Sequence, residues 1–164
     1  MSKTKDSERL PFWKKISFGI GGFAENFFHN AFNIMATPFL NIGFGVSPGL
    51  VSIAMTIPRL WDAITDPVMG AISDNFSSRF GRRRPFVFVG GILTAIAFAA
   101  IWWIPQGLGE RGTFFAFLGM LLLYYTFFTI FVVPYLALGF EMTPDYNERT
   151  RVMSYRSFFS TGAG

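Results

Sequence analysis

Two carboxylates, Asp62 and Asp66, lie one helical turn apart late in an otherwise apolar stretch that begins near residue 50. At about 100° per residue they share one helix face of about 80° with Arg59 and Gly70. Ionisable groups inside a membrane are costly, so they normally face a bundle interior or a water-filled cavity. Two neighbouring carboxylates in a low dielectric favour a bound cation or a proton, and Thr65 adds a hydroxyl nearby.

This spacing predicts a cation site. One alternative stays open, in which Asp62 forms an ion pair with Arg59 three residues earlier and neither carboxylate binds an ion. A single arginine cannot neutralise both acids, so we favour a cation-binding role for Asp66 in particular.

A second polar face precedes this one in the sequence, in the first apolar segment. Its members fall within an arc of about 140°, and the opposite side carries phenylalanine and isoleucine. They predict either one wall of a polar solute cavity or a set of hydrogen bonds between helices. The face consists of Gly22, Glu25, Asn26, His29, Asn30 and Asn33.

The elements that must position these side chains follow from composition. Apolar residues make up 51% of the 164 residues, phenylalanine alone supplies 22, and charges cluster in short blocks between long apolar runs. This distribution predicts an all-α polytopic membrane protein. We expect a polar N-terminal segment, 1–15, and a transmembrane domain, 16–164. The expected helices span residues 16–40, 50–73, 86–104, 114–140 and 153–164, with the last one incomplete.

The basic residues predict the orientation. Five precede the first helix, four lie between the second and third, and three lie near the start of the fifth. By the positive-inside rule, the N-terminus is cytoplasmic in a multi-pass protein of the cell (plasma or inner) membrane. Basic residues on the cytoplasmic side of the lipid bilayer also account for the net charge of +4, so the charge does not require a nucleic-acid partner.

Enzymatic chemistry has little support. The sequence holds no cysteine and no nucleophilic triad, phosphate-binding loop or metalloprotease motif. We expect no enzyme activity and no cofactor other than a coupling ion. A membrane-embedded enzyme would have to rest on Glu25, His29 and the two aspartates alone.

The run Arg59-x-x-Asp62-Ala-x-x-Asp66-Pro67-x-x-Gly70 is followed by Asp74 and by Arg79-Phe-Gly81-Arg82-Arg83-Arg84-Pro85. This pattern resembles the glycoside–pentoside–hexuronide:cation symporters of the major facilitator superfamily, which include the melibiose permease. The resemblance implies the N-terminal half of a twelve-helix fold, with four transmembrane helices and the start of a fifth. The C-terminal half of the same transporter would then be its partner.

The resemblance also implies a coupling-ion site for Na+ or H+. The matching positions are Asp62, Asp66, Thr65 and, on the fourth helix, Thr129. The melibiose permease has an asparagine where this chain has Thr65, so the choice of ion stays open. Asp74 with Arg82, Arg83 and Arg84 would form a cytoplasmic charge network that holds one face closed, with Arg59 as a charged partner in the membrane.

The solute side matches the family less well. Positions 25 and 26 replace a lysine and a sugar-binding aspartate, Val132 replaces a second aspartate, and Leu136 replaces a tryptophan. Arg156 lies one residue before a family arginine. Galactoside specificity is therefore not implied. The candidate solute-binding residues are Glu25, Asn26, His29, Tyr125, Val132, Leu136 and Arg156.

These observations predict cation-coupled symport of a small-molecule solute, a sugar, a glycoside or a related polar compound. Two alternatives stay open: a family member that carries a non-sugar, amphipathic or lipid-like solute, and a transporter-derived membrane sensor or scaffold.

Overall fold

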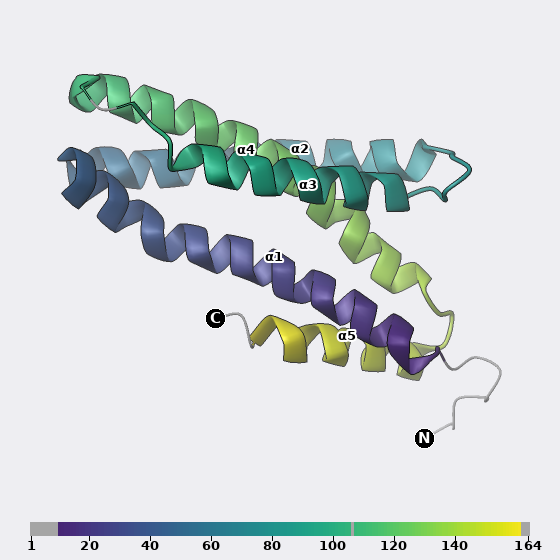
Figure 1. Cartoon of the computed structure of the whole chain (residues 1–164). Helices are drawn as coiled ribbons and strands as arrows, with labels where there is room; N and C mark the ends of the chain where they lie inside the picture. The colour runs from purple at the N-terminus through teal and green to yellow at the C-terminus, as the bar shows by residue number, and fades with distance from the viewer. Residues whose placement is uncertain (1–9, 106, 162–164) are drawn as a thin grey trace. The chain divides into compact units, whose positions relative to one another are not determined.

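The structure is a computed structural model that describes residues 10–105 and 107–161, which form helices joined by short turns (Figure 1). The predicted basic residues Lys3, Lys5 and Arg9 and positions 162–164 of the predicted fifth helix lie outside the described residues. Within them no strand occurs, as the sequence predicted. The elements are α1 (Phe12–Pro38), a π-helical turn η2 (Phe39–Gly43), α2 (Pro48–Asn75), α3 (Arg84–Ile101), α4 (Gly109–Glu141) and α5 (Tyr146–Thr161).

The chain divides into two compact units, and the divisions fall within α1 and α4. The first unit contains α1 up to Phe32, α4 from Tyr135 onward, and α5. The second unit, Asn33–Pro134, contains the rest of α1, η2, α2, α3 and most of α4. Pro134, which was expected to loosen the fourth helix, lies inside α4 at one of these divisions.

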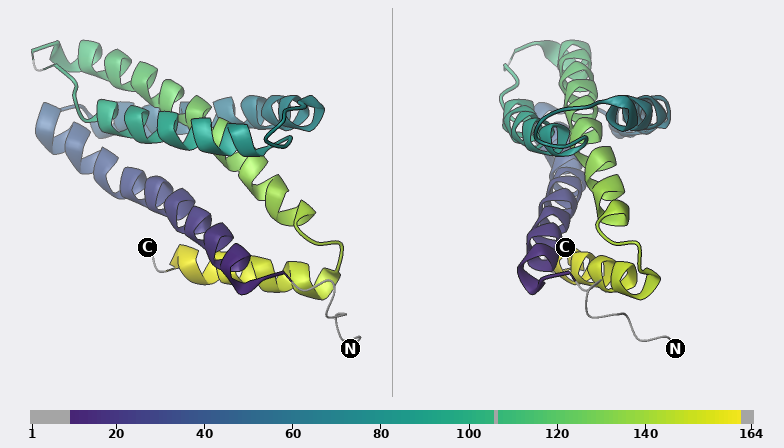
Figure 2. Two further views of the ribbon diagram at one scale, coloured as in Figure 1. Left: turned by 45° about the vertical axis from the view of Figure 1, so that its right-hand side comes forward. Right: turned by 90° about the vertical axis from the view of Figure 1, so that its right-hand side faces the viewer.

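In the second unit, α3 and α4 pack closely and run in opposite directions (Figure 2). Gly90 lies against the backbone of Phe131, while Phe98, two turns later on α3, meets Tyr124 on α4 with ring centroids 6.1 Å apart. A Cβ at position 90 would lie 2.7 Å from the Phe131 amide nitrogen. Glycine is therefore required here, and small residues are common where membrane helices approach closely.

The first unit is held together by an aromatic contact between α1 and α4. The rings of Phe18 and Tyr135 stack with centroids 4.6 Å apart, and the Tyr135 hydroxyl donates a hydrogen bond of 2.6 Å to the Phe18 carbonyl. Glycines make room on both sides, since a Cβ at Gly21 would meet the Tyr135 ring and one at Gly139 would meet Phe18. These residues lie at the centre of the unit's core.

The start of the fifth helix was predicted wrongly. We expected it at residue 153, but α5 begins at Tyr146. The cause is a cap, because the Asp145 carboxylate accepts a 2.7 Å hydrogen bond from the Glu148 amide. Asp followed three residues later by Glu is a recognised helix-start signal, and it was present in the sequence.

Other helix ends differ from the prediction by about one turn. The first helix begins at Phe12 rather than residue 16, because the Lys14 amide already bonds the Pro11 carbonyl. The third ends at Ile101 rather than 104, since the amides of the next two residues bond carbonyls only three residues back. The fourth begins at Gly109 rather than 114, where a positive φ of 69° turns the chain.

Glu148 also anchors the start of α1. Its carboxylate forms an ion pair with Lys15 and accepts the Leu10 amide at 3.1 Å, and Arg151 lies 3.6 Å away. Burial alone would raise the pKa of the Glu148 carboxyl, but the hydrogen bonds from Lys15 and Leu10 and the charges of Lys15 and Arg151 lower it below its ordinary 4.5. The ionised form is therefore the one that stabilises this contact.

This lowered pKa predicts a pH dependence. A depressed carboxyl pKa contributes stability that is complete above its unfolded value of 4.5 and is lost as the pH falls through the lower folded value. We expect Glu148→Gln to reduce the thermal unfolding temperature at about pH 7, and the difference from wild type to shrink below about pH 4.5. Unfolding scans across this range would measure it, and a difference that does not change with pH would contradict the ionic role.

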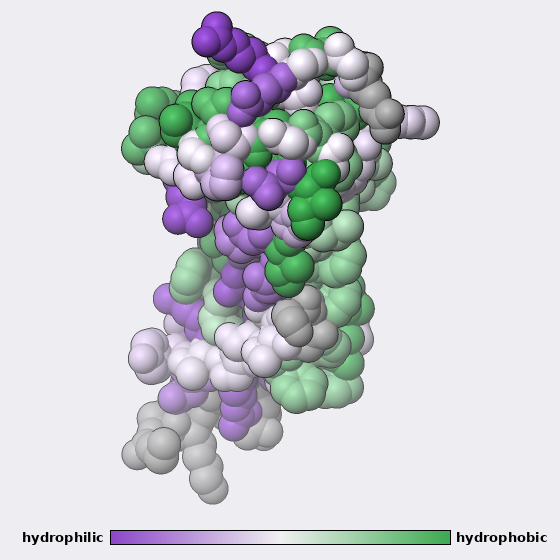
Figure 3. All heavy atoms as spheres, turned by 90° about the vertical axis from the view of Figure 1, so that its left-hand side faces the viewer, coloured by the Kyte–Doolittle hydropathy of each residue, from purple (hydrophilic) through white to green (hydrophobic). Residues whose placement is uncertain are grey.

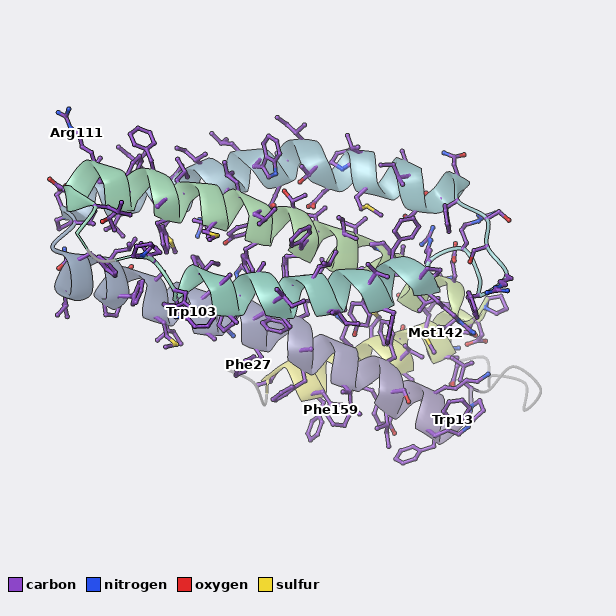
Figure 4. All side chains as sticks on the ribbon, turned by 45° about the horizontal axis from the view of Figure 1, so that its top comes forward. Trp13, Phe27, Trp103, Arg111, Met142 and Phe159 are labelled. Carbon is purple, nitrogen blue, oxygen red and sulfur yellow. The ribbon has the colours of Figure 1, made fainter. Side chains whose placement is uncertain are left out.

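Large apolar side chains lie at the surface. Trp103 is 87% exposed and Phe88 71% exposed, and the space-filling view of one face (Figure 3) shows hydrophobic groups beside hydrophilic ones. Figure 4 shows Trp103 past the end of α3 and Arg111 in the first turn of α4, at the same end of the second unit. By length and composition, α3 and α4 could each cross a membrane. Such exposed apolar surface suits hydrocarbon better than water.

Candidate functional site

The two carboxylates of α2 lie close to α4. Thr129 is only 3% exposed, and its hydroxyl donates a 3.0 Å hydrogen bond to Asp66 Oδ1. The charges of Asp62 and Asp66 interact, and Asp62 Oδ1 is buried without a hydrogen-bond partner. A buried oxygen without a hydrogen-bond partner is costly. A proton bound to this oxygen, or a hard cation coordinated by it, would remove that cost, so the site fits either one.

Thr65 and Trp61 complete this arrangement. The Thr65 hydroxyl donates to the Trp61 carbonyl at 3.1 Å, which leaves the lone pairs of its oxygen free to act as a ligand. The Trp61 indole N–H donates to Thr126 on α4 at 3.0 Å. Neither Trp61 nor Thr126 was among the predicted site residues. A tryptophan beside the first carboxylate was a visible signal, but its partner depends on packing between helices.

Successive residues along α2 contact successive residues along α4. Trp61 meets Thr126, Asp66 meets Thr129, and the Cβ position of Gly70 comes within 3.9 Å of Val133. Because numbers rise together on both helices, α2 and α4 run in the same direction. One shared interface therefore sets the distance between the Asp66 carboxylate and the Thr129 hydroxyl.

Arg59 does not neutralise the site through an ion pair. Its side chain is exposed, and no ion pair joins it to Asp62 in the described part of the chain. The alternative pairing left open by the sequence is therefore absent. Tyr125 is 7% exposed and interacts electrostatically with both Arg59 and Asp62, which places this predicted solute residue near the first carboxylate.

The polar face of α1 meets α5 in the first unit. Glu25 forms a bidentate ion pair with Arg156, with Arg156 Nη2 2.6 Å and 2.7 Å from the two carboxylate oxygens. Asn26 donates to Ser160, and Asn30 donates to Asn26. The sequence left open whether these groups face a solute or hold helices together. In this structure they bind one another, and Ser160 was not predicted.

The remaining predicted solute-binding residues are His29, Val132 and Leu136, and their positions give little support for a solute contact. His29 is exposed and takes part in an interaction with its surroundings. Val132 and Leu136 are half-buried apolar residues of α4. Neither carries a polar group that could contact a solute hydroxyl.

In the described part of the chain, the predicted charge network after α2 includes one ion pair between its own members, and Arg83 has a further contact besides. Asp74 forms an ion pair with Arg83, whose side chain is 10% exposed against 55% for Asp74. Arg82 and Arg84 are exposed. Ser78 orders the turn between Asp74 and Arg83, since its carbonyl accepts a hydrogen bond from the Gly81 amide and its hydroxyl donates one to the Gly81 carbonyl.

Comparison with known proteins identifies the family. The family model described as MFS/sugar transport protein matches residues 17–164. The chain belongs to this family. It is an all-α polytopic membrane protein, and the structure corresponds to the N-terminal portion of the major facilitator fold, as the sequence predicted.

Individual relatives of the family are named as symporters. An uncharacterised symporter of Synechocystis is 34% identical over 99% of this chain and 31% of its own length. A putative glycoside/cation symporter of Escherichia coli, YagG, is 33% identical over 92% of this chain and 32% of its own length. A sodium-dependent lysophosphatidylcholine symporter of Danio rerio is 30% identical over 95% of this chain and 29% of its own length. The chain therefore spans about a third of the length of the relatives it matches.

For a member of the MFS/sugar transport protein family, the Asp74–Arg83 pair can be tested by a double-mutant cycle. We expect Asp74→Asn and Arg83→Gln each to destabilise the complete protein, and the double variant to lose about 1 kcal/mol less than their sum. Thermal unfolding of the four proteins measures this coupling. Strictly additive losses would show that the pair contributes nothing.

Proposed function

We propose that this chain forms the N-terminal part of a secondary active transporter that couples the inward movement of a solute to Na+ or H+. Asp62 and Asp66 bind the cation, and the hydroxyls of Thr65 and Thr129 are further ligands. The observation that carries the proposal is the bond from Thr129 to Asp66 beside the unpartnered Asp62 Oδ1. Symport, rather than an enzymatic reaction, also agrees with the names of the relatives, which are all symporters.

The solute we favour is a saccharide, a glycoside or a related polar compound. Support comes from the glycoside/cation symporter among the relatives and from the hydrogen-bonding groups on α1 and α5. A lipid-like solute is the second candidate, because other relatives are named lysophosphatidylcholine symporters. We place the protein in the plasma or inner membrane with its N-terminus in the cytoplasm, on the distribution of lysine and arginine.

Transport itself can be tested on the complete protein in proteoliposomes. Uptake of a panel of glycosides, oligosaccharides and lysophospholipids would be measured with and without a Na+ gradient at fixed pH, and then with a pH gradient. We expect one solute class to accumulate only when one of the two gradients is present. Solute binding without accumulation under either gradient would instead favour a sensor or scaffold.

Thr129 offers a sharper test of the cation site. We expect Thr129→Val to raise the half-saturating cation concentration about tenfold, since a hydrogen bond to a charged group contributes about 1.5–3 kcal/mol. Thr129→Ser keeps the hydroxyl and should remain close to wild type. Uptake as a function of cation concentration gives both values, and equal cation dependence in the valine variant would remove Thr129 from the site.

A further inference from the structure

Three hydrogen bonds join the side chains of Glu25 and Arg156 in one ion pair. Arg156 Nη2 contacts both carboxylate oxygens, and Nε adds a third bond of 3.2 Å to Oε2. The two side chains are 18% and 24% exposed, so the pair is largely removed from solvent. Bidentate, charge-assisted bonds of this kind are among the stronger polar contacts in proteins.

The backbone fixes the pair in place. A Cβ on Gly22 would meet Arg156 Cγ at 2.6 Å and the Arg156 carbonyl oxygen at 3.2 Å, so the glycine permits the close approach of α1 and α5. Asn26 meets Ser160 about one turn farther along both helices. Glu25 and Arg156 therefore belong to a continuous contact between two helices.

Unused hydrogen-bonding capacity remains on both members. Arg156 Nη1 takes part in none of the three bonds to Glu25. The Tyr135 hydroxyl also contacts the guanidinium, and even if it accepts one N–H, another can still donate to a solute hydroxyl oxygen. Each carboxylate oxygen has further lone pairs that can accept from a solute hydroxyl. A neutral polyhydroxyl compound can thus bind the pair while the pair stays intact.

An anionic solute meets a different situation. Beside the intact pair its negative charge gains no net attraction, because Glu25 already neutralises Arg156. To form a bidentate ion pair with the guanidinium the anion would have to displace Glu25, which leaves the Glu25 carboxylate largely buried and without its partner. Breaking a buried pair in this way is strongly unfavourable, because the remaining charge is uncompensated. The arginine is thereby masked from anions although it lies beside the polar face of α1.

We propose that Glu25 neutralises Arg156 and so restricts the solute site to compounds without net negative charge, either neutral or zwitterionic. Glu25 is then a specificity-determining residue that selects against uronides and other anions. This inference rests on the transport function proposed above, because it concerns the solute of that same site.

The test compares solutes that differ in charge but little in shape. The complete transporter in proteoliposomes would be given nitrophenyl glucoside and galactoside beside the corresponding nitrophenyl uronides. Lysophosphatidylcholine would be given beside lysophosphatidylglycerol of the same acyl chain. Cation-driven uptake of the neutral or zwitterionic member, at least tenfold above its anionic counterpart, is the expected result for the wild type.

Variants then assign the selectivity to Glu25. Glu25→Gln keeps the shape but exposes the arginine charge, so uptake of the anionic member should rise at least tenfold. Glu25→Asp keeps the charge and should retain the wild-type preference. The double variant Glu25→Gln/Arg156→Gln has no charge to expose and should show no gain for anions, which separates charge from a general effect on folding.

The outcomes distinguish this inference from the function on which it rests. Wild-type uptake of a uronide or lysophosphatidylglycerol equal to that of its neutral counterpart would overturn the role of Glu25 while leaving symport intact. An equal gain for anions in the double variant would overturn it as well. Absence of cation-driven uptake for every compound would overturn the proposed transport function itself, and this inference with it.

Discussion

We expect cation-driven accumulation to be lost when Asp66 is replaced by cysteine in the complete transporter. This is the largest functional effect we expect, since the change removes a carboxylate at the point where α2 and α4 share a hydrogen bond. Changes to residues that only support a metal ligand cost about 10–100-fold in affinity, so loss of a direct ligand should lower cation-dependent uptake by at least about 100-fold.

A matched control lies on the same helix. Ser52 is exposed on α2, and its hydroxyl bonds only the Pro48 carbonyl one turn back. We expect Ser52→Ala to leave uptake and its cation dependence unchanged. Both variants should reach the membrane in similar amounts, as judged by immunoblotting. Normal accumulation by the Asp66→Cys protein would remove this residue from the coupling mechanism.

Substitution of Gly90 by alanine should produce the largest loss of stability. The added Cβ would lie 2.7 Å from the Phe131 amide nitrogen and 2.9 Å from its Cα, and backbone atoms cannot rotate away as a side chain can. Helices α3 and α4 must therefore separate, which we expect to cost about 1–3 kcal/mol. Thermal unfolding of the purified complete transporter measures this loss.

The adjacent glycine supplies the control. A Cβ on Gly91 would meet only the Phe131 ring, at 3.7 Å, which is an ordinary van der Waals distance. Gly91→Ala has the same chemistry and nearly the same helix position, and it should unfold within about 0.5 kcal/mol of wild type. Equal destabilisation by both substitutions would show that loss of glycine itself, rather than the contact with α4, decides the effect.

The α-helical membrane class and the approximate positions of the first four helices could be predicted from the sequence. Their apolar runs are long, and short charged blocks separate them, so the pattern needs no knowledge of packing. The fifth helix was placed seven residues late because its first two turns are polar. The cap from Asp145 to the Glu148 amide, rather than hydropathy, decides where it begins.

Partners of the site residues were harder to predict. The neighbourhood of Asp62 and Asp66 follows from helical spacing within one element. The bonds from Trp61 to Thr126 and from Asn26 to Ser160 join residues far apart in the sequence, and they depend on how helices pack. The pairing of Glu25 with Arg156 could have been predicted from the sequence, because opposite charges in two apolar membrane helices usually form an ion pair.

The masking of Arg156 also changes how the polar face of α1 is interpreted. Taken singly, each charged residue suggests attraction of an oppositely charged solute. As a pair they present no net charge, while their remaining hydrogen-bonding atoms suit hydroxyl groups. Charge selectivity of this site is therefore a property of two helices together.

Direct measurement of cation binding tests the central claim most closely. The complete transporter would be purified as wild type and as Asp62→Asn/Asp66→Asn, and Na+ binding and proton release would be followed together by calorimetry in buffers of different ionisation enthalpy. The wild type should bind Na+ or exchange a proton at this site, and the double variant should do neither. Unchanged Na+ binding and proton exchange in the double variant would contradict the assignment of Asp62 and Asp66 as the coupling site.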